Sequence, residues 1–354
     1  MLVKFLKTVS RWWWNKNFLR KNRDLMKHDD NLQKYRLVLG VGRSGTTWLS
    51  CVLSETPTPI RFFMEPFYPL RPRVSFSVSG DQTAIEYTPR LQDQHPLSNI
   101  FRSLLTPQHD WHSMGLSGNL IRNDNDWQVC IIKEVHSLLA AEAMLKFLKC
   151  PTVFLLRDPL YIIDSLFARD GLKTTYLCNE SKYVNNPSFL KRFSPDPTKD
   201  ISMILKESVS NDKIREKIIL DKVLTVSLIQ SMFRVLSSEF QYAQIIEYES
   251  LCQSPELYFR SIASFLSLDW SESIEQYLLK TLRSALHQRK NDYPIFLDTI
   301  NQIGRPFKFL SKEEVLLCRR VLNDYSFDLS SKPTILTKIY ENTSIPKKEP
   351  YQNS

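Results

Sequence analysis

Short apolar runs alternate with longer stretches of helical apolar spacing over most of the chain. The apolar runs predict buried strands at 35–41, 60–64, 129–135, 151–159 and 243–251. Apolar residues three and four positions apart predict helices at 46–55, 137–149, 160–169, 214–240 and 254–268. Strands that alternate with helices predict an α/β fold of three layers, in which a central parallel sheet lies between two layers of helices.

Two long stretches, 71–125 and 171–212, lack this periodicity and are rich in polar and turn-forming residues. We interpret both as irregular inserts, because loops of this length are typically functional lids or disordered insertions. The expected organisation is one folded domain at 31–335 that carries the two inserts, followed by a polar tail at 336–354.

The N-terminal segment, residues 1–30, combines an apolar helical face with basic residues on the opposite side. It holds eight basic and three acidic residues, so +5 of the formal net charge of +9 lies there. This pattern is typical of a helix lying in an anionic membrane surface; packing on the domain, or disorder, are the alternatives. No apolar run reaches the length of a spanning helix, and no secretory cleavage site follows. We expect a cytoplasmic protein, peripheral at the inner membrane face.

The basic balance of the whole chain, with a pI of about 9.1, predicts an anionic partner. Nucleic acid is disfavoured, because no basic stripe with interleaved aromatic residues accompanies the charge. The six cysteines form no C-x-x-C pair and no Cys/His cluster with zinc spacing, so no metal site is expected. Their apolar surroundings favour a reducing compartment, although scattered cysteines can still pair.

The stretch after the first predicted strand, VLGVGRSGTTWLS at 38–50, is nearly a phosphate-binding loop. Gly40 and Gly45 have the spacing of G-x-x-x-x-G-K-[ST], but Thr46 replaces the lysine and Arg43 stands inside the loop. Backbone N–H groups of such a loop, with the hydroxyls of Ser44, Thr46 and Thr47, form an anion site. The lysine that reaches the terminal phosphates of a nucleotide is missing, so a sulfuryl group without metal fits this P-loop-like turn better.

Two motifs together resemble those of sulfotransferases that use 3′-phosphoadenosine 5′-phosphosulfate (PAPS). The run GRSGTTWL at 42–49 is similar to the family's 5′-phosphosulfate loop. The strand that ends in Arg157-Asp158-Pro159, with Ser165 further on, is similar to the second signature, whose Arg and Ser hold the 3′-phosphate. The resemblance covers roughly residues 35–325, and its style is that of carbohydrate and tyrosyl-protein sulfotransferases.

Weaker similarities extend the implied nucleotide site. Tyr248 begins YESL, which resembles the Y-E-D-L segment of the family, and Arg305 lies in GRPFK, which resembles the late glycine-and-basic loop near the 3′-phosphate. The residues 301–303 depart from the expected Arg-Lys-Gly, and Lys308 is an alternative to Arg305. The family places an aromatic residue near the adenine, which the resemblance assigns to Trp48; a core position is the alternative. The implied PAPS-binding residues are Gly42, Arg43, Ser44, Gly45, Thr46, Thr47, Trp48, Arg157, Ser165, Tyr248 and Arg305.

The resemblance implies an enzyme that moves a sulfuryl group from PAPS to an acceptor hydroxyl, without a metal. Glu65, in FFMEPF, is the expected general base, assisted by Arg43 on the transferring group. His136, in KEVH, is the alternative base; it stands one residue later than in K-T-H, and such a slip on a strand reverses the face. For Lys133 of the same run, a solvated side chain is the interpretation. The E-P segment favours a sugar or glycolipid acceptor.

Two other classes of function stay open on the sequence. A P-loop kinase or NTPase would use Mg-ATP and would need Asp158 as its metal ligand, beside an arginine that competes for the carboxylate. A non-catalytic nucleotide-binding adaptor could carry a degenerate loop of the same kind, because competence depends on geometry.

Overall fold

The computed structural model describes residues 33–67, 101, 104–105, 120–172, 177–283 and 304–327. The expected membrane-surface helix in 1–30 and the polar tail at 336–354 lie outside these residues, as does most of the insert at 71–125. Among the helices that are described, none is both long enough and apolar enough to cross a membrane.

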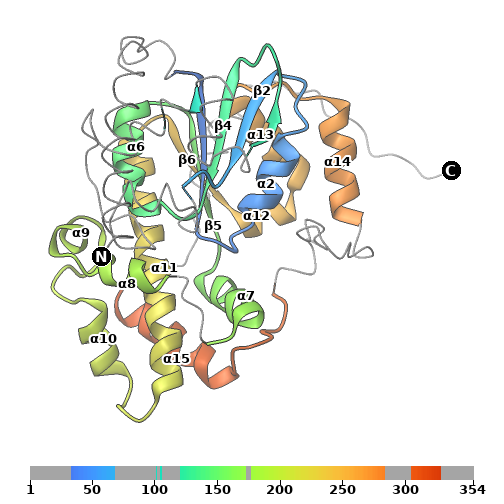
Figure 1. Cartoon of the computed structure of the whole chain (residues 1–354). Coiled ribbons are helices and arrows are strands. Elements are labelled where there is room, and N and C mark those ends of the chain that lie inside the picture. Colours follow the sequence, from blue (N-terminus) through green and yellow to red (C-terminus); the bar gives the residue numbers. More distant parts are fainter. Residues whose placement is uncertain are drawn as a thin grey trace, which may run out of the picture.

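A six-stranded sheet, in the order β3-β2-β4-β1-β5-β6, forms the centre of the molecule (Figure 1). Its strands are β1 (Tyr35–Leu39), β2 (Ile60–Met64), β3 (Leu120–Asn123), β4 (Val129–Glu134), β5 (Thr152–Leu156) and β6 (Ala243–Glu247). All neighbours are parallel except β3, which pairs antiparallel with β2 at one edge. The predicted α/β fold with a central, mostly parallel sheet is confirmed.

Helices cover both faces of the sheet because its strands are apolar on both faces, as is typical of parallel sheets. One face packs on α2 (Thr46–Leu53), α12 (Tyr248–Gln253), α13 (Pro255–Phe265) and α14 (Glu272–Arg283). The other face packs on α6 (Ala141–Leu148), α7 (Pro159–Asp170), α9 (Pro187–Phe193), α11 (Ile214–Glu239) and α15 (Lys312–Asp324). Strand β1 shows the alternation, since Val38 faces the first layer and Leu37 and Leu39 face the second.

The register of the strands brings the sequence motifs to one edge of the sheet. Strand β1 lies between β4 and β5, with Leu39 opposite Glu134 on one side and Phe154 on the other. Strand β2 ends with Met64 opposite Lys133 of β4. The carboxyl ends of β1, β2, β4 and β5 therefore meet at the same edge, which is where ligands bind in open α/β sheets.

Two expectations about local structure are wrong. The predicted strand at 243–251 ends at Glu247, and the next residues form α12, because Tyr248, Leu251 and Cys252 are buried at helical spacing. The second insert is not irregular: beside α9 it holds α8 (Cys178–Val184) and α10 (Ile201–Ser208). The side chains of Asn186 and Asp200 cap α9 and α10, and such capping signals are easily overlooked in a polar stretch.

Candidate active site

The P-loop-like turn requires both of its flanking glycines. A Cβ on Gly40 would lie 2.7 Å from Thr46 Cγ2 and 2.9 Å from the Leu155 carbonyl oxygen. Gly45 has φ +97°, and its Cβ would lie 2.5 Å from the ring of Tyr248. Both positions therefore exclude a side chain, and Gly45 also needs the left-handed conformation that only glycine adopts readily. The chain reverses there and enters α2 at Thr46.

The turn contains a buried polar side chain that the described part of the protein leaves unsatisfied. The Ser44 side chain is buried, and its Oγ has no hydrogen-bond partner among the residues that the structure describes. A buried hydroxyl without a partner costs free energy, so a ligand acceptor at this point would stabilise it. Thr46 and Thr47 begin α2, where backbone N–H groups and the helix dipole favour an anion. The turn thus has the donors that an anionic group requires.

Three residues predicted to bind the nucleotide lie together where this turn meets β5 and α7. The Nε of Arg43 donates a hydrogen bond to Ser165 Oγ over 3.1 Å. The Nη1 of Arg157 donates to the Arg43 carbonyl oxygen over 2.9 Å, and its guanidinium lies 4.4 Å from the Tyr248 ring centroid. The structure therefore brings together residues that lie more than a hundred positions apart in the sequence.

Positive charge accumulates around these contacts. The pKa of Arg43 is lowered by desolvation, and then by the charges of Arg169 and Arg157, with a smaller effect of Arg305. The buried Nε atoms of Arg157 and Arg305 have no hydrogen-bond partner within the described ranges. Neighbouring guanidinium groups repel one another, and an anion bound between them offsets that repulsion. A cluster of this kind is typical of sites that bind phosphate or sulfate.

Asp158 has contacts that leave it unsuited to the metal role of the kinase alternative. It caps α7, since its Oδ1 accepts a hydrogen bond from the Leu160 N–H over 2.9 Å. Its Oδ2 forms an ion pair with Arg319 of α15. Throughout the described residues, no group of three or more His, Cys, Asp or Glu side chains is arranged to hold a metal ion.

The two candidate bases lie next to each other. His136 Nε2 is 3.5 Å from Glu65 Oε2, and Lys133 forms an ion pair with Glu65 Oε1. Burial by itself raises the pKa of Glu65, but the hydrogen bond of His136 and the charge and hydrogen bond of Lys133 outweigh it and lower the pKa to about 2. Sequence reasoning treated Glu65 and His136 as competitors, whereas the structure pairs them.

Lys133 is the residue that sequence reasoning missed. Its side chain is buried, with 1% exposure for the residue, and it lies at the penultimate position of β4, so the expectation of a solvated lysine is wrong. A lysine directly after the apolar run Val129–Ile132 of a buried strand was the signal, because such a charge must find a partner. The face-reversal reasoning against His136 also fails, since β4 ends at Glu134 and strand alternation does not extend beyond it.

A buried carboxylate fixes the turn that carries His136. Glu134 Oε1 accepts hydrogen bonds from the N–H groups of Val135, over 2.8 Å, and His136, over 2.6 Å. Its Oε2 accepts from the Phe67 N–H over 3.0 Å, which ties in the segment after Glu65. Burial raises the pKa of Glu134, while the charge of His136 and the hydrogen bond from its N–H lower it. Glu134 therefore holds the two candidate bases in place.

Two aromatic residues assigned to the nucleotide lie in the core instead. Trp48 is 2% exposed, its Nε1 donates to Thr281 Oγ1 over 3.0 Å, and its ring packs on Phe259. The face needed for adenine stacking is thus covered by protein, which corrects the expectation for Trp48. Tyr248 is buried as well, between Gly45 and Arg157, so it supports these two residues from behind rather than presenting a free face to a ligand.

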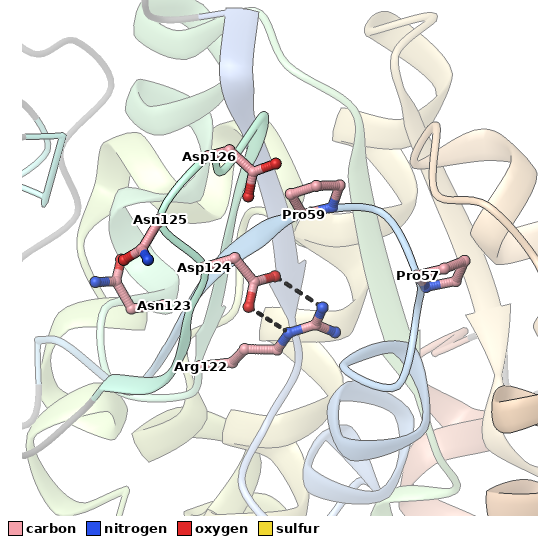
Figure 2. A pocket seen from close by; sticks show the side chains of 7 residues that line it. All are labelled: Pro57, Pro59, Arg122, Asn123, Asp124, Asn125 and Asp126. Carbon is pink, nitrogen blue, oxygen red and sulfur yellow. Dashed lines mark hydrogen bonds and ion pairs between the residues drawn. The ribbon is translucent and has the colours of Figure 1, made fainter.

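A cavity of about 470 Å³ lies away from this site (Figure 2). It is lined by Pro57, Pro59, Arg122, Asn123, Asp124, Asn125 and Asp126. These residues precede β2, end β3 or lie between β3 and β4, at the amino end of the parallel strands. Arg122 pairs with Asp124 over 2.7 Å and donates to the Ser54 and Thr56 carbonyl oxygens, so it clamps the end of α2 to the sheet.

The described residues thus define an α/β protein with a P-loop-like turn and a Glu–His–Lys cluster at the carboxyl edge of its sheet. No protein-family model matches the chain, and no curated protein matches its sequence. Its structure is similar to three solved sulfotransferases. They are mouse sulfotransferase SULT7A1 complexed with PAP (12% identity, TM-score 0.44, 85% of this chain and 87% of that chain), sulfotransferase STF9 from Mycobacterium avium (14%, 0.41, 90% and 83%) and the sulfotransferase domain from the curacin biosynthetic pathway (13%, 0.37, 83% and 98%).

Proposed function

We propose that this protein is a sulfotransferase that moves the sulfuryl group of PAPS to an acceptor hydroxyl. The contact that carries the proposal is the junction of Arg43, Ser165 and Arg157, which joins the P-loop-like turn to the second anion motif. One ligand with an anionic group at each end of an adenosine would engage both motifs. A nucleoside triphosphate offers no charge on the ribose side, and the turn lacks the lysine that would serve its terminal phosphates.

Each part of PAPS has a matching set of residues in this chain. The turn from Gly42 to Thr47, with the unpartnered Ser44 hydroxyl, would hold the 5′-phosphosulfate through its N–H and O–H donors. Arg157, Ser165 and Arg305 would hold the 3′-phosphate. Guanidinium groups bind phosphate through two parallel hydrogen bonds, which accounts for arginine rather than lysine in these places.

The Glu65–His136 pair is positioned to take the proton of the acceptor. In the reaction the acceptor oxygen forms a bond to sulfur as the bond from sulfur to the phosphate oxygen breaks, and PAP leaves with the electron pair. A carboxylate whose pKa is about 2 is a weak base, so the imidazole of His136 receives the proton and Glu65 orients it. This division of roles has the logic of a histidine held by a carboxylate. The ammonium of Lys133 and the guanidinium of Arg43 stabilise developing negative charge.

Charged side chains near His136 support a polar acceptor. Glu180 of α8 and Lys222 of α11 are both buried. Burial raises the pKa of Glu180, while a backbone hydrogen bond and the charges of His136 and Lys222 lower it. Buried charges of both signs near the candidate base suit a ligand rich in hydroxyl groups, because such a ligand can hydrogen-bond to them. A sugar hydroxyl, on a carbohydrate or a glycolipid, is therefore the acceptor class we propose.

Nucleotide-dependent stabilisation tests the proposed activity first. PAP at about one hundred times its Kd is expected to stabilise the full chain by about 2.7 kcal/mol, because a ligand that binds only the folded state shifts the unfolding equilibrium. ATP, with or without Mg²⁺, should stabilise it much less, because it lacks the 3′-phosphate. Thermal unfolding with each ligand gives the comparison. Stabilisation by Mg-ATP but not by PAP would replace the sulfotransferase with a kinase.

Membrane attachment through residues 1–30 is a separate proposal that rests on sequence alone. The apolar face and the net charge of +5 predict binding to anionic vesicles that weakens as salt rises. Removing residues 1–30 is expected to abolish co-sedimentation with vesicles and to leave PAP affinity within about twofold, since the proposed site lies elsewhere. Vesicle binding that survives the truncation would contradict the proposal.

A further inference from the structure

Helix α7 contacts both of the proposed anion-binding loops. Ser165 contacts Arg43 of the first loop. Tyr161, Asp164 and Phe167, each three residues apart, contact the segment 304–310 that leads into α15 (Figure 1). The Tyr161 ring stacks on Phe307 with 4.8 Å between centroids, and its hydroxyl donates to the Arg305 carbonyl oxygen over 3.2 Å.

Asp164 makes the strongest of these contacts. Its carboxylate is fully buried and accepts hydrogen bonds from three consecutive backbone N–H groups. The donors are Phe309 over 2.7 Å, Leu310 over 3.1 Å and Lys308 over 3.1 Å. The guanidinium of Arg305 lies 3.7 Å from the same carboxylate. Hydrogen bonds to a charged acceptor are stronger than neutral ones, so this single side chain determines the path of the segment.

A carboxylate inside a site for an anionic ligand needs an explanation. Asp164 points its oxygen atoms at the segment 304–310, where three N–H groups and Arg305 offset its charge. Arg305 in turn has a buried Nε without a hydrogen-bond partner in the described part of the chain. Its charge also contributes to the lowered pKa of Arg43. The position of Arg305 relative to the other arginines thus depends on where Asp164 holds the segment.

We propose that Asp164 is a positioning residue, which fixes the segment 304–310 on α7 and so places Arg305 at the 3′-phosphate of the nucleotide. The inference rests on the proposed function, because it concerns one end of the same ligand. It assigns Asp164 no contact with the ligand. Its effect should therefore appear only for nucleotides that carry a 3′-phosphate, whereas a purely structural carboxylate would affect all nucleotides alike.

The test compares PAP with adenosine 5′-phosphate (AMP), which lacks the 3′-phosphate. In Asp164→Asn the amide keeps one acceptor oxygen but turns an N–H group toward one of the backbone donors. The Kd of PAP is expected to rise about 10- to 100-fold, which is the range of one or two charge-assisted hydrogen bonds, and the Kd of AMP to change less than about twofold. In an Arg305→Ala background the same substitution should add little, because the two residues act as one unit.

Glu314→Gln is the matched control. Glu314 is also buried, accepts a hydrogen bond from the Ser311 N–H over 2.8 Å and pairs with Arg215. It follows the same segment but holds the start of α15, so its substitution should lower the melting temperature and leave the PAP-to-AMP ratio unchanged. Equal losses for PAP and AMP in Asp164→Asn, or an unchanged PAP affinity, would overturn the positioning role.

Hydrogen exchange on the wild-type chain keeps the test open if Asp164→Asn does not fold. PAP should slow exchange of the amides of residues 308–310 more than AMP does, since only PAP engages Arg305. Equal protection by both nucleotides would refute the inference. If the wild type itself binds PAP no more tightly than AMP, the proposed 3′-phosphate site fails, whatever Asp164 does.

Discussion

The His136→Asn variant is expected to bind PAP like the wild type and to lose about 10²- to 10⁴-fold in kcat. The acceptor hydroxyl is a poor nucleophile until its proton is leaving, and the imidazole of His136 is the group we propose to receive it. Asparagine keeps hydrogen-bonding capacity at similar size but accepts no proton in this range. Because the loss concerns the transition state, kcat and kcat/KM should fall together.

Glu65→Gln separates the two members of the pair. If Glu65 only orients the imidazole, this variant loses less than His136→Asn, and the double variant is hardly worse than His136→Asn alone. Rescue of turnover by added imidazole gives a second criterion, since it should restore His136→Asn but not Glu65→Gln if the imidazole is the base.

Two results would contradict the division of roles. Near-normal turnover of His136→Asn with a full loss in Glu65→Gln would return the base to Glu65, with Lys133 moving off the carboxylate during the reaction. A loss of PAP affinity in Glu65→Gln as large as that in Arg43→Ala would instead make Glu65 a support of the nucleotide site. Isothermal titration with PAP distinguishes these outcomes.

Local patterns in the sequence predicted the parts of the site that depend on local geometry. A strand, a glycine-containing turn and a helix in succession predict a P-loop-like turn. Glycine is required at position 45, where φ is positive, and at position 40, where a Cβ would clash with its neighbours. The same holds for Arg157, which ends a strand, and for Ser165 on the following helix. In a parallel sheet the ends of such strands meet, so the sequence already predicted one shared edge.

Contacts between distant segments could not be predicted from the sequence. Trp48 lies in the core, where Thr281 accepts a hydrogen bond from its indole. The two residues are 233 positions apart, so no local sequence pattern predicts this contact. The pairing of Glu65 with His136 depends on the strand order, in which β2 and β4 are neighbours although the insert separates them in sequence. The contacts of Asp164 could not be predicted from the sequence either, since its three hydrogen-bond donors come from residues 308–310.

The candidate site therefore divides into two halves, which we expect to affect different steps of the reaction. In the half at β2 and β4, Lys133 and His136 both contact Glu65, and the two together lower the pKa of that carboxylate against the effect of burial. In the half at β5 and α7, desolvation and then the charges of Arg169 and Arg157 lower the pKa of Arg43, so a bound anion would be favoured there. Variants of the first half should thus act on turnover and variants of the second on nucleotide affinity.

Arg157→Ala is expected to weaken PAP binding by about 30-fold or more, because removal of a desolvated charged partner costs about 2 kcal/mol or more. The arginine serves twice: its guanidinium is proposed to hold the 3′-phosphate, and its Nη1 holds the Arg43 carbonyl oxygen of the turn. Arg157→Lys keeps the charge but not the planar fork, so its loss should be intermediate. Titration calorimetry with PAP measures all three proteins.

Arg192→Ala is the control for the loss of one positive charge. Arg192 pairs with Glu142 and Glu239 on the α6–α11 side of the molecule, so its removal should leave PAP affinity unchanged. The melting temperature without ligand shows whether Arg157→Ala is folded, and raised salt should weaken PAP binding less in this variant than in the wild type, because one ionic contact is gone. PAP affinity within about threefold of the wild type would remove Arg157 from the nucleotide site, because a buried guanidinium on a phosphate contributes far more than that.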